Sequence, residues 1–274
     1  MTPARARRRR ALAPLAVAAA LVVAAAAAVG LGSGASSPSD AARPRAADTA
    51  IDLPAPVRPA FTPGKPIPLS SRAVAHWTPV VRPVTARSEP AAAAPAVAAL
   101  ETRTPEGTSN LVLALGRATD AEGNVWVRAR LPILPNNTTG WVPRSALGRY
   151  VLVRTHLVVD LDDFRATLYR DGRAIFSADV GIGQEAWPTP TGRFYIRNKL
   201  TRYASPQYGP LAFGTSARSP TLTDWPAGGF VGIHGTNQPE ILPGRVSHGC
   251  IRMRNPDILR LAALMPVGTP LTVQ

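Results

Sequence analysis

The single cysteine of this 274-residue chain, Cys250, stands in the run Ser247-His248-Gly249-Cys250-Ile251-Arg252. It follows His234, in the run Gly232-Ile233-His234-Gly235-Thr236, by sixteen positions. A thiol attacks a carbonyl carbon as the thiolate, and at its ordinary pKa of about 8.5 only a few per cent of it is ionised at neutral pH. Two histidines near the cysteine provide what an activated thiol needs. The pattern therefore predicts a cysteine nucleophile.

Two other uses of these side chains compete with that prediction. Two histidines and one cysteine are three of the four ligands of a zinc site, but His248 and Cys250 flank a single glycine and no fourth Asp, Glu or His accompanies them. We therefore expect no metal and no cofactor. The second alternative is a Cys250–Cys250 disulfide between two copies, which would silence the thiol. The other histidines, His76 and His156, are predicted to be packing groups.

The N-terminal segment has the composition of an export signal. Arg5 and Arg7 to Arg10 precede an uncharged run of small apolar residues from Ala11 to about Leu31. This run is either a transmembrane helix that holds the arginines in the cytoplasm, or a signal peptide cleaved at the small residues around Ala35. Both interpretations predict that the rest of the chain lies in the cell envelope, anchored to the membrane or secreted.

The formal net charge of +14 is spread along the chain. The first ten residues carry five arginines and no acid, residues 35–149 carry thirteen basic and eight acidic residues, and residues 150–274 carry thirteen and nine. This mild, even charge lacks the clustered basic stripe of nucleic-acid-binding proteins, so we expect no nucleic-acid partner. It favours diffuse, salt-sensitive attraction to polyanionic envelope polymers.

Composition divides the chain into four parts: the basic and apolar segment 1–34, a linker 35–70, a first β-rich domain 71–149 and a second β-rich domain 150–274. The linker is rich in Ala, Pro and Ser and has too few large apolar residues to fold, so we expect it to be semi-extended.

The first domain alternates short apolar segments with turns. Five strands are predicted, at residues 73–75, 96–98, 111–115, 125–129 and 140–142. The order Gly-x-x-Trp126-Val-x-x-x-Leu-Pro, an asparagine-rich turn and Gly-Trp141-Val-Pro resembles bacterial SH3-like wall domains, which implies a small barrel. Trp126 and Trp141 are expected to be packing residues of this barrel, with a ligand groove as the alternative.

The second domain is also β-rich. Strands are predicted at residues 150–153, 157–161, 166–170, 174–181, 192–196, 229–234 and 269–273. One helix is predicted at 255–264, with Asn255 as its N-cap and Pro256 at the first helical position. Residues 199–228, rich in Pro, Ser and Thr, are predicted to form a loop that covers the substrate. The fold class is therefore all-β with one short helix.

Three motifs give residues 150–274 a family resemblance. Thr189-Pro190-Thr191-Gly192-Arg193-Phe194, then Ile-His-Gly-Thr at 233–236, then Ser-His-Gly-Cys-Ile-Arg-Met at 247–253 resemble the L,D-transpeptidase (YkuD-like) family of cell-wall enzymes. The resemblance implies a β-sandwich-type catalytic domain that acts on peptidoglycan stem peptides. The cysteine attacks the carbonyl of the third residue of a donor tetrapeptide, D-Ala leaves, and the acyl group passes to an amine of another stem as a 3–3 cross-link. Carbapenem β-lactams are expected to acylate the same thiol.

The same resemblance implies a role for each motif residue. Cys250 is the nucleophile, and His234 is the base that takes its proton and remains as the imidazolium beside the thiolate. The backbone N–H groups at Gly249 and Cys250 are the expected oxyanion donors, while Ser247 and His248 shape the site.

The Gly235 carbonyl is expected to orient the imidazole of the base. Arg252 is expected to pair either with a substrate carboxylate or with Asp257. The residues expected to contact substrate are Arg252, Thr236, Gly235, Tyr208 and Phe230.

Two alternatives to cross-linking stay open in the sequence. With water as the acceptor, the same site would be an L,D-carboxypeptidase. With a vestigial motif, the chain would be a non-catalytic peptidoglycan-binding envelope protein. The intact pair of His234 and Cys250 favours an enzyme.

Overall fold

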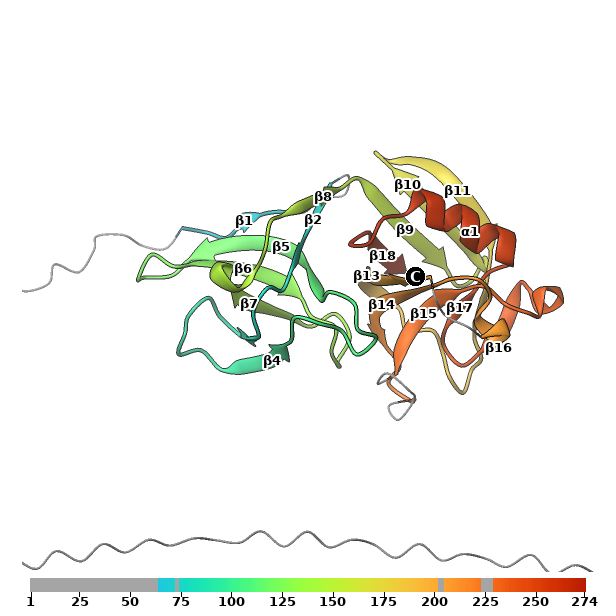
Figure 1. The fold of residues 1–274 in the computed structure, drawn as a ribbon, viewed down its shortest axis with the longest axis horizontal. Coiled ribbons are helices and arrows are strands. Elements are labelled where there is room, and N and C mark those ends of the chain that lie inside the picture. The colour runs from blue at the N-terminus through green and yellow to red at the C-terminus, as the bar shows by residue number, and fades with distance from the viewer. Residues whose placement is uncertain (1–63, 72–73, 202–204, 223–228) are drawn as a thin grey trace, which may run out of the picture. The chain divides into compact units, whose positions relative to one another are not determined.

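The computed structural model describes residues 64–71, 74–201, 205–222 and 229–274, and these belong to one compact unit. The predicted export segment and most of the predicted linker lie outside the described residues. The described part consists of two β-sheets and one α-helix, which confirms the all-β prediction (Figure 1). No helix within these ranges is both long and apolar enough to span a membrane.

The first sheet has eight strands in the order β4-β3-β7-β6-β5-β2-β8, with β1 paired to β5. Its core contains buried valine, leucine and alanine side chains such as Val112, Val127 and Val142. The strands are β1 Ile67–Pro68, β2 Ala75–Pro79, β3 Val84–Arg87, β4 Ala96–Leu100, β5 Leu111–Thr119, β6 Val125–Arg130, β7 Thr139–Pro143 and β8 Val151–Val153, and a 3₁₀ turn, η1, spans Arg144–Ala146.

Both tryptophans singled out in the sequence are packing residues. Trp126 and Trp141 are 4% and 9% exposed. The indole N–H of Trp126 donates to Asp120 Oδ2 at 2.8 Å, and this bond satisfies the polar atom of an otherwise apolar ring. The expectation of core and edge packing is confirmed, because neither ring is free to line a groove.

The change of sheet comes later than the predicted domain boundary. Residues 150–153 were assigned to the second domain, but β8 pairs antiparallel with β2, where Val153 faces Ala75. The second sheet begins with β9 at Thr155. A three-residue strand carries too little pattern to indicate which sheet it joins, because only the pairing partner decides that.

The second sheet has ten strands in the order β11-β10-β9-β18-β13-β14-β15-β17-β12-β16. The strands are β9 Thr155–Asp160, β10 Arg165–Arg170, β11 Arg173–Asp179, β12 Gly181–Gly183, β13 Gly192–Leu200, β14 Ala212–Arg218, β15 Phe230–His234, β16 Gly244–Ser247, β17 Ile251–Arg252 and β18 Pro270–Val273. The same part of the chain also contains two 3₁₀ turns and one helix. These are η2 Pro206–Tyr208, η3 Pro239–Ile241 and α1 Asn255–Leu264.

The predicted covering loop contains a strand of this sheet. Residues 212–218 form β14, which pairs with β13 on one side and β15 on the other. Phe213, Thr215 and Ala217 are buried on one face of β14, while the intervening residues carry Gly, Ser and Arg. Small polar residues in the strand hid its period of two and gave the segment the composition of a loop.

The helix has the predicted bounds but not the predicted cap. Arg254 occupies the N-cap position and Asn255 is the first helical residue. The side chain of Asn255 is engaged elsewhere, because its Oδ1 accepts the backbone N–H of Thr236 at 3.0 Å. A tertiary hydrogen bond has therefore replaced the local cap expected from the sequence.

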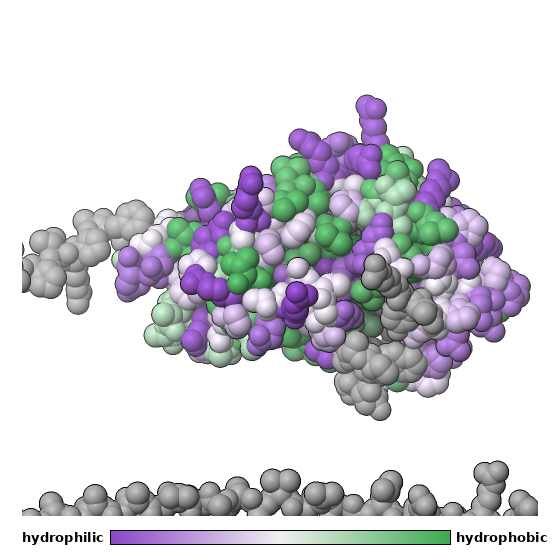
Figure 2. Space-filling model, viewed as in Figure 1, coloured by the Kyte–Doolittle hydropathy of each residue, from purple (hydrophilic) through white to green (hydrophobic). Residues whose placement is uncertain are grey.

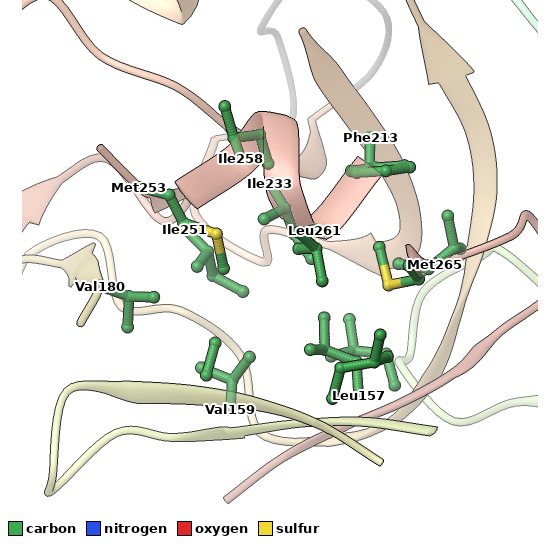
Figure 3. Packing of buried hydrophobic residues seen from close by; sticks show 14 of the residues in the cluster. Leu157, Val159, Val180, Phe213, Ile233, Ile251, Met253, Ile258, Leu261 and Met265 are labelled. Atoms are coloured by element: carbon green, nitrogen blue, oxygen red, sulfur yellow. The ribbon is translucent and has the colours of Figure 1, made fainter. Parts of the chain in front are cut away.

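The core of the second sheet lies between its two halves. Figure 3 shows Leu157 and Val159 facing Ile233 and Ile251 across the core, with Leu261 of α1 among them. All five side chains are fully buried. On the face drawn in Figure 2, by contrast, hydrophobic patches are small and mixed with hydrophilic side chains.

Candidate active site

Two neighbouring parallel strands bring the predicted nucleophile and base together. β15 pairs with β17 so that Ile233 faces Ile251 and His234 faces Arg252. Because side chains alternate along a strand, Ile233 and Ile251 enter the core while the residues beside them turn to the opposite face. Cys250 directly precedes β17 and is thus level with Gly232 of β15.

Gly232 lies close to both reactive groups. Its backbone N–H donates to Cys250 Sγ at 3.4 Å. A Cβ placed on Gly232 would lie 3.9 Å from both Cys250 Sγ and His234 Cδ2. The thiol and the imidazole therefore share one small region, and a backbone dipole points at the sulfur where negative charge would develop.

His234 is held as a neutral base. It is 3% exposed, and its Nδ1 lies 2.6 Å from the Gly235 carbonyl, as predicted. A carbonyl only accepts, so Nδ1 carries the proton and Nε2 keeps its lone pair. Burial lowers the pKa of His234 to about 4, the Gly235 carbonyl opposes this, and the positive charge of Arg252 adds to the lowering.

The thiol is also held in its neutral form. Burial raises the pKa of the Cys250 thiol, while the Gly232 N–H and the charge of Arg252 act in the opposite direction. Because the pKa of the base is lowered and that of the acid is raised, the resting site favours a neutral thiol and a neutral imidazole.

Ser247 organises the turn that presents the cysteine. Its fully buried hydroxyl donates to the Cys250 carbonyl at 2.5 Å and accepts the Gly249 N–H at 3.1 Å. The Gly249 N–H was expected to be an oxyanion donor, but this bond commits it to Ser247. Gly249 itself is buried with φ +106°, a backbone conformation that residues with a side chain rarely adopt.

A cavity of about 330 Å³ opens over Cys250 and His234. Aromatic rings lie around this cavity. The centroid of the Tyr208 ring, from η2, lies 4.6 Å from that of the His234 ring. The ring centroids of the exposed His248 and the half-buried Trp187 are 4.3 Å apart. Phe230 also lines the cavity.

Phe230 rests on a buried ion pair. The Arg197 guanidinium lies 3.7 Å from the Phe230 ring centroid, and Arg197 donates to Glu106 Oε2 at 2.8 Å. Arg197 is 2% exposed. The first sheet thus contributes, through the loop that carries Glu106, a charge that balances an arginine behind the cavity wall.

The predicted substrate-contacting residues divide into two groups. Tyr208, Phe230 and Arg252 line the cavity, and among the described residues Arg252 forms no ion pair, so the predicted alternative with Asp257 is not present. Gly235 and Thr236, by contrast, are buried beside the cavity and do not line it.

Several residues around the site were missed in the sequence. Thr189 donates to the Gly249 carbonyl, Trp187 packs on His248, and Asn255 binds the Thr236 N–H. Thr189 lies in the first of the three family motifs, but no role was predicted for it. Nothing in the local pattern indicates contacts that join segments so far apart in the chain.

The zinc alternative finds no set of ligands in the described ranges. Within them, no three His, Cys, Asp or Glu side chains are grouped as a metal ion would require. His234, moreover, uses Nδ1 on the Gly235 carbonyl.

Known proteins resemble part of this chain. Residues 154–273 match the family model of the YkuD L,D-transpeptidase catalytic domain. A putative L,D-transpeptidase YkuD of Bacillus subtilis is 34% identical over 118 residues, which are 43% of this chain and 65% of that protein. A probable L,D-transpeptidase ErfK/SrfK of Salmonella typhimurium is 33% identical over 139 residues, covering 43% of each chain.

Solved structures of L,D-transpeptidases also resemble part of this chain. The NMR structure of the catalytic domain of the E. faecium L,D-transpeptidase is 29% identical, covering 44% of this chain and 96% of that one, with a TM-score of 0.35. The chain thus spans less than two thirds of the length of the curated relatives named above. The similarity to YkuD-type L,D-transpeptidase catalytic domains therefore concerns residues 154–273, the part of the chain that matches the family model.

Proposed function

We propose that this protein is a cysteine-dependent L,D-transpeptidase that acts on peptidoglycan stem tetrapeptides. One observation carries the proposal: the paired strands β15 and β17 bring the Cys250 thiol and the His234 imidazole to the same side of Gly232, where both line a cavity of about 330 Å³. The match of residues 154–273 to the L,D-transpeptidase family model supports the choice of substrate. Neither metal nor cofactor is required by this chemistry.

The first half-reaction forms a thioester and follows from the neutral resting pair. As Cys250 Sγ attacks the carbonyl carbon of the third stem residue, its proton passes to Nε2 of His234, and the carbonyl π electrons move to the oxygen. Collapse of this intermediate breaks the carbon–nitrogen bond to D-Ala, whose nitrogen takes the proton from His234. The Gly232 N–H stabilises the negative charge on sulfur while it exists.

The second half-reaction repeats these steps in reverse order. A side-chain amine of another stem attacks the thioester, loses a proton to His234 and forms the 3–3 amide. The thiolate leaves and recovers the proton from the imidazolium. Water in place of the amine would give L,D-carboxypeptidase hydrolysis from the same site.

Incubation of the full, reduced chain with disaccharide-tetrapeptides tests the proposal. We expect release of D-Ala and appearance of a 3–3 dimer by mass spectrometry, with neither product from Cys250→Ala. Hydrolysed tripeptide without dimer would assign the carboxypeptidase activity instead. A folded wild-type protein that releases no D-Ala would favour the non-catalytic peptidoglycan-binding function.

Carbapenems give a simpler measurement of the same thiol. Opening of the β-lactam by Cys250 leaves the whole drug attached as a thioester, so one adduct is expected on the intact mass of the wild-type chain. The adduct should be absent from Cys250→Ala and should form more slowly on His234→Gln, which lacks the base.

We further propose that the N-terminal segment exports the chain and that the first sheet is an SH3-like module that positions the catalytic domain on the cell wall. The basic and apolar pattern of residues 1–34 and the separate apolar core of the first sheet support this. Fractionation of cells should place the protein in the envelope. Deletion of residues 1–34 should leave it in the cytoplasm.

A further inference from the structure

The hydroxyl of Thr189 lies against the peptide that joins Gly249 to the nucleophile. Thr189 Oγ1 is 2.9 Å from the Gly249 carbonyl oxygen and 2.9 Å from the Gly183 nitrogen. The hydroxyl has one proton, which goes to the carbonyl, and its oxygen accepts the Gly183 N–H. At 4% exposure, Thr189 is shielded from water that could replace either bond.

The segment that carries Thr189 is seated tightly on β12. A Cβ on Gly183 would lie 2.2 Å from the Trp187 carbonyl oxygen and 2.5 Å from the Thr189 nitrogen. Such distances leave no room for any side chain. The position of the Thr189 hydroxyl is therefore fixed by the backbone of β12 and not by the loop alone.

Fixing the Gly249 carbonyl also fixes the N–H of Cys250. The two groups belong to one planar trans peptide and point in opposite directions. With the carbonyl directed at Thr189, the Cys250 N–H is directed away from it. Ser247 takes the Gly249 N–H and the Cys250 carbonyl, so the Cys250 N–H is the one polar backbone group of these two residues with no partner among the described residues.

The Gly249–Cys250 peptide needs the hydrogen bond from Thr189 because Gly249 does not restrict its own backbone conformation. Glycine at φ +106° has no Cβ to restrict it and can exchange between backbone conformations at little cost. A rotation of the Gly249–Cys250 peptide would exchange the positions of its carbonyl and N–H. It would then place an acceptor where an oxyanion needs a donor.

We propose that Thr189 is a positioning residue that locks the Gly249–Cys250 peptide and so aims the Cys250 N–H at the oxyanion of the acylation step. This rests on the acyl transfer proposed above. It predicts that Thr189 affects attack on a carbonyl, which creates an oxyanion, and not attack on a saturated carbon, which creates none.

Two reactions of the same thiol separate these effects. The full chain is treated with a carbapenem, which requires the oxyanion donor, and with iodoacetamide, which alkylates by displacement of iodide. Thr189→Val removes the hydroxyl at nearly constant volume, and Thr189→Ser retains it. Thr191→Val is the matched control, because Thr191 is exposed two residues further along the same segment.

We expect carbapenem acylation of Thr189→Val to slow about 10- to 100-fold, somewhat less than the loss of a whole oxyanion donor. Alkylation should change less than twofold, and Thr189→Ser and Thr191→Val should react like the wild type. An equal slowing of both reactions, or of neither, would overturn the proposal. A wild type that is not acylated would instead overturn the proposed function.

The wild-type chain provides a second measurement if Thr189→Val does not fold. Hydrogen exchange of the Cys250 amide should be fast in the free protein and slow after carbapenem acylation, because the adduct oxygen then accepts its proton. An amide already protected in the free protein, or still unprotected in the adduct, would refute the assignment of this N–H.

Discussion

Burial of neutral His234 should make the stability of the protein depend on pH in a defined window. The pKa of His234 is lowered from 6.5 to about 4 in the folded protein. Between these values the unfolded chain binds a proton that the folded protein does not bind. Acidification therefore favours the unfolded chain, and the free energy of unfolding falls as the pH drops from about 6.5 to about 4.

The size of the effect follows from the difference between the two pKa values. One pKa unit corresponds to about 1.4 kcal/mol, so the full effect is about 3 kcal/mol. About 2 kcal/mol of this is already lost at pH 5. No correction for solvent screening is needed, because His234 is only 3% exposed.

Urea unfolding at pH 7 and pH 5 measures this difference when the wild type is compared with His234→Gln. Other titrating groups contribute equally to both proteins and cancel, so the wild type should lose about 2 kcal/mol more than the variant. A wild type that gained stability on acidification relative to His234→Gln would refute the argument and indicate a charged imidazole paired with the thiolate.

Three further predictions concern the surroundings of the site. Glu106→Gln leaves the Arg197 guanidinium buried without its counter-charge and should lower the free energy of unfolding in urea by about 3 to 5 kcal/mol. Adding Arg197→Met should recover most of this loss. Glu101 is exposed, so Glu101→Gln should leave the free energy of unfolding unchanged. Gly249→Ala forces a side chain into φ +106°, so it should cost about 1 to 3 kcal/mol and slow carbapenem acylation, whereas normal acylation would contradict the role of this backbone. Asn255→Leu removes the acceptor of a backbone N–H and should lower the melting temperature by an amount equivalent to about 1 to 3 kcal/mol, while Asn255→Asp, which keeps the oxygen, should lose less.

The sequence predicted the secondary structure well where the pattern is strong. Helix α1 was predicted with its bounds, because a proline follows its first residue and apolar residues recur on one face. The strand Ala212–Arg218 was missed, because glycine, serine and arginine on its second face resemble a loop. The cap of α1 was wrong because a contact with Thr236 outweighed a local preference.

The charge states of Cys250 and His234 could not be predicted from the sequence for a similar reason. Motif spacing suggests a thiol beside a base, and the resemblance implied an imidazolium beside the thiolate. The structure buries the imidazole of His234, and burial disfavours charge more than any single neighbour restores it. The extent of burial depends on what packs over a residue, which no local pattern states.

The sequence by itself determined which residues share a face. Alternation places Cys250 and Arg252 opposite Ile251, and His234 opposite Ile233, because the period of two is a property of the extended backbone. Only the tertiary structure decided which strands meet. The bond from Thr189 to Gly249 joins residues 60 positions apart, and its existence depends on the pairing of β12 with β16 and β17. Such pairings arise from the packing of the whole core, since each strand's own pattern is compatible with many partners.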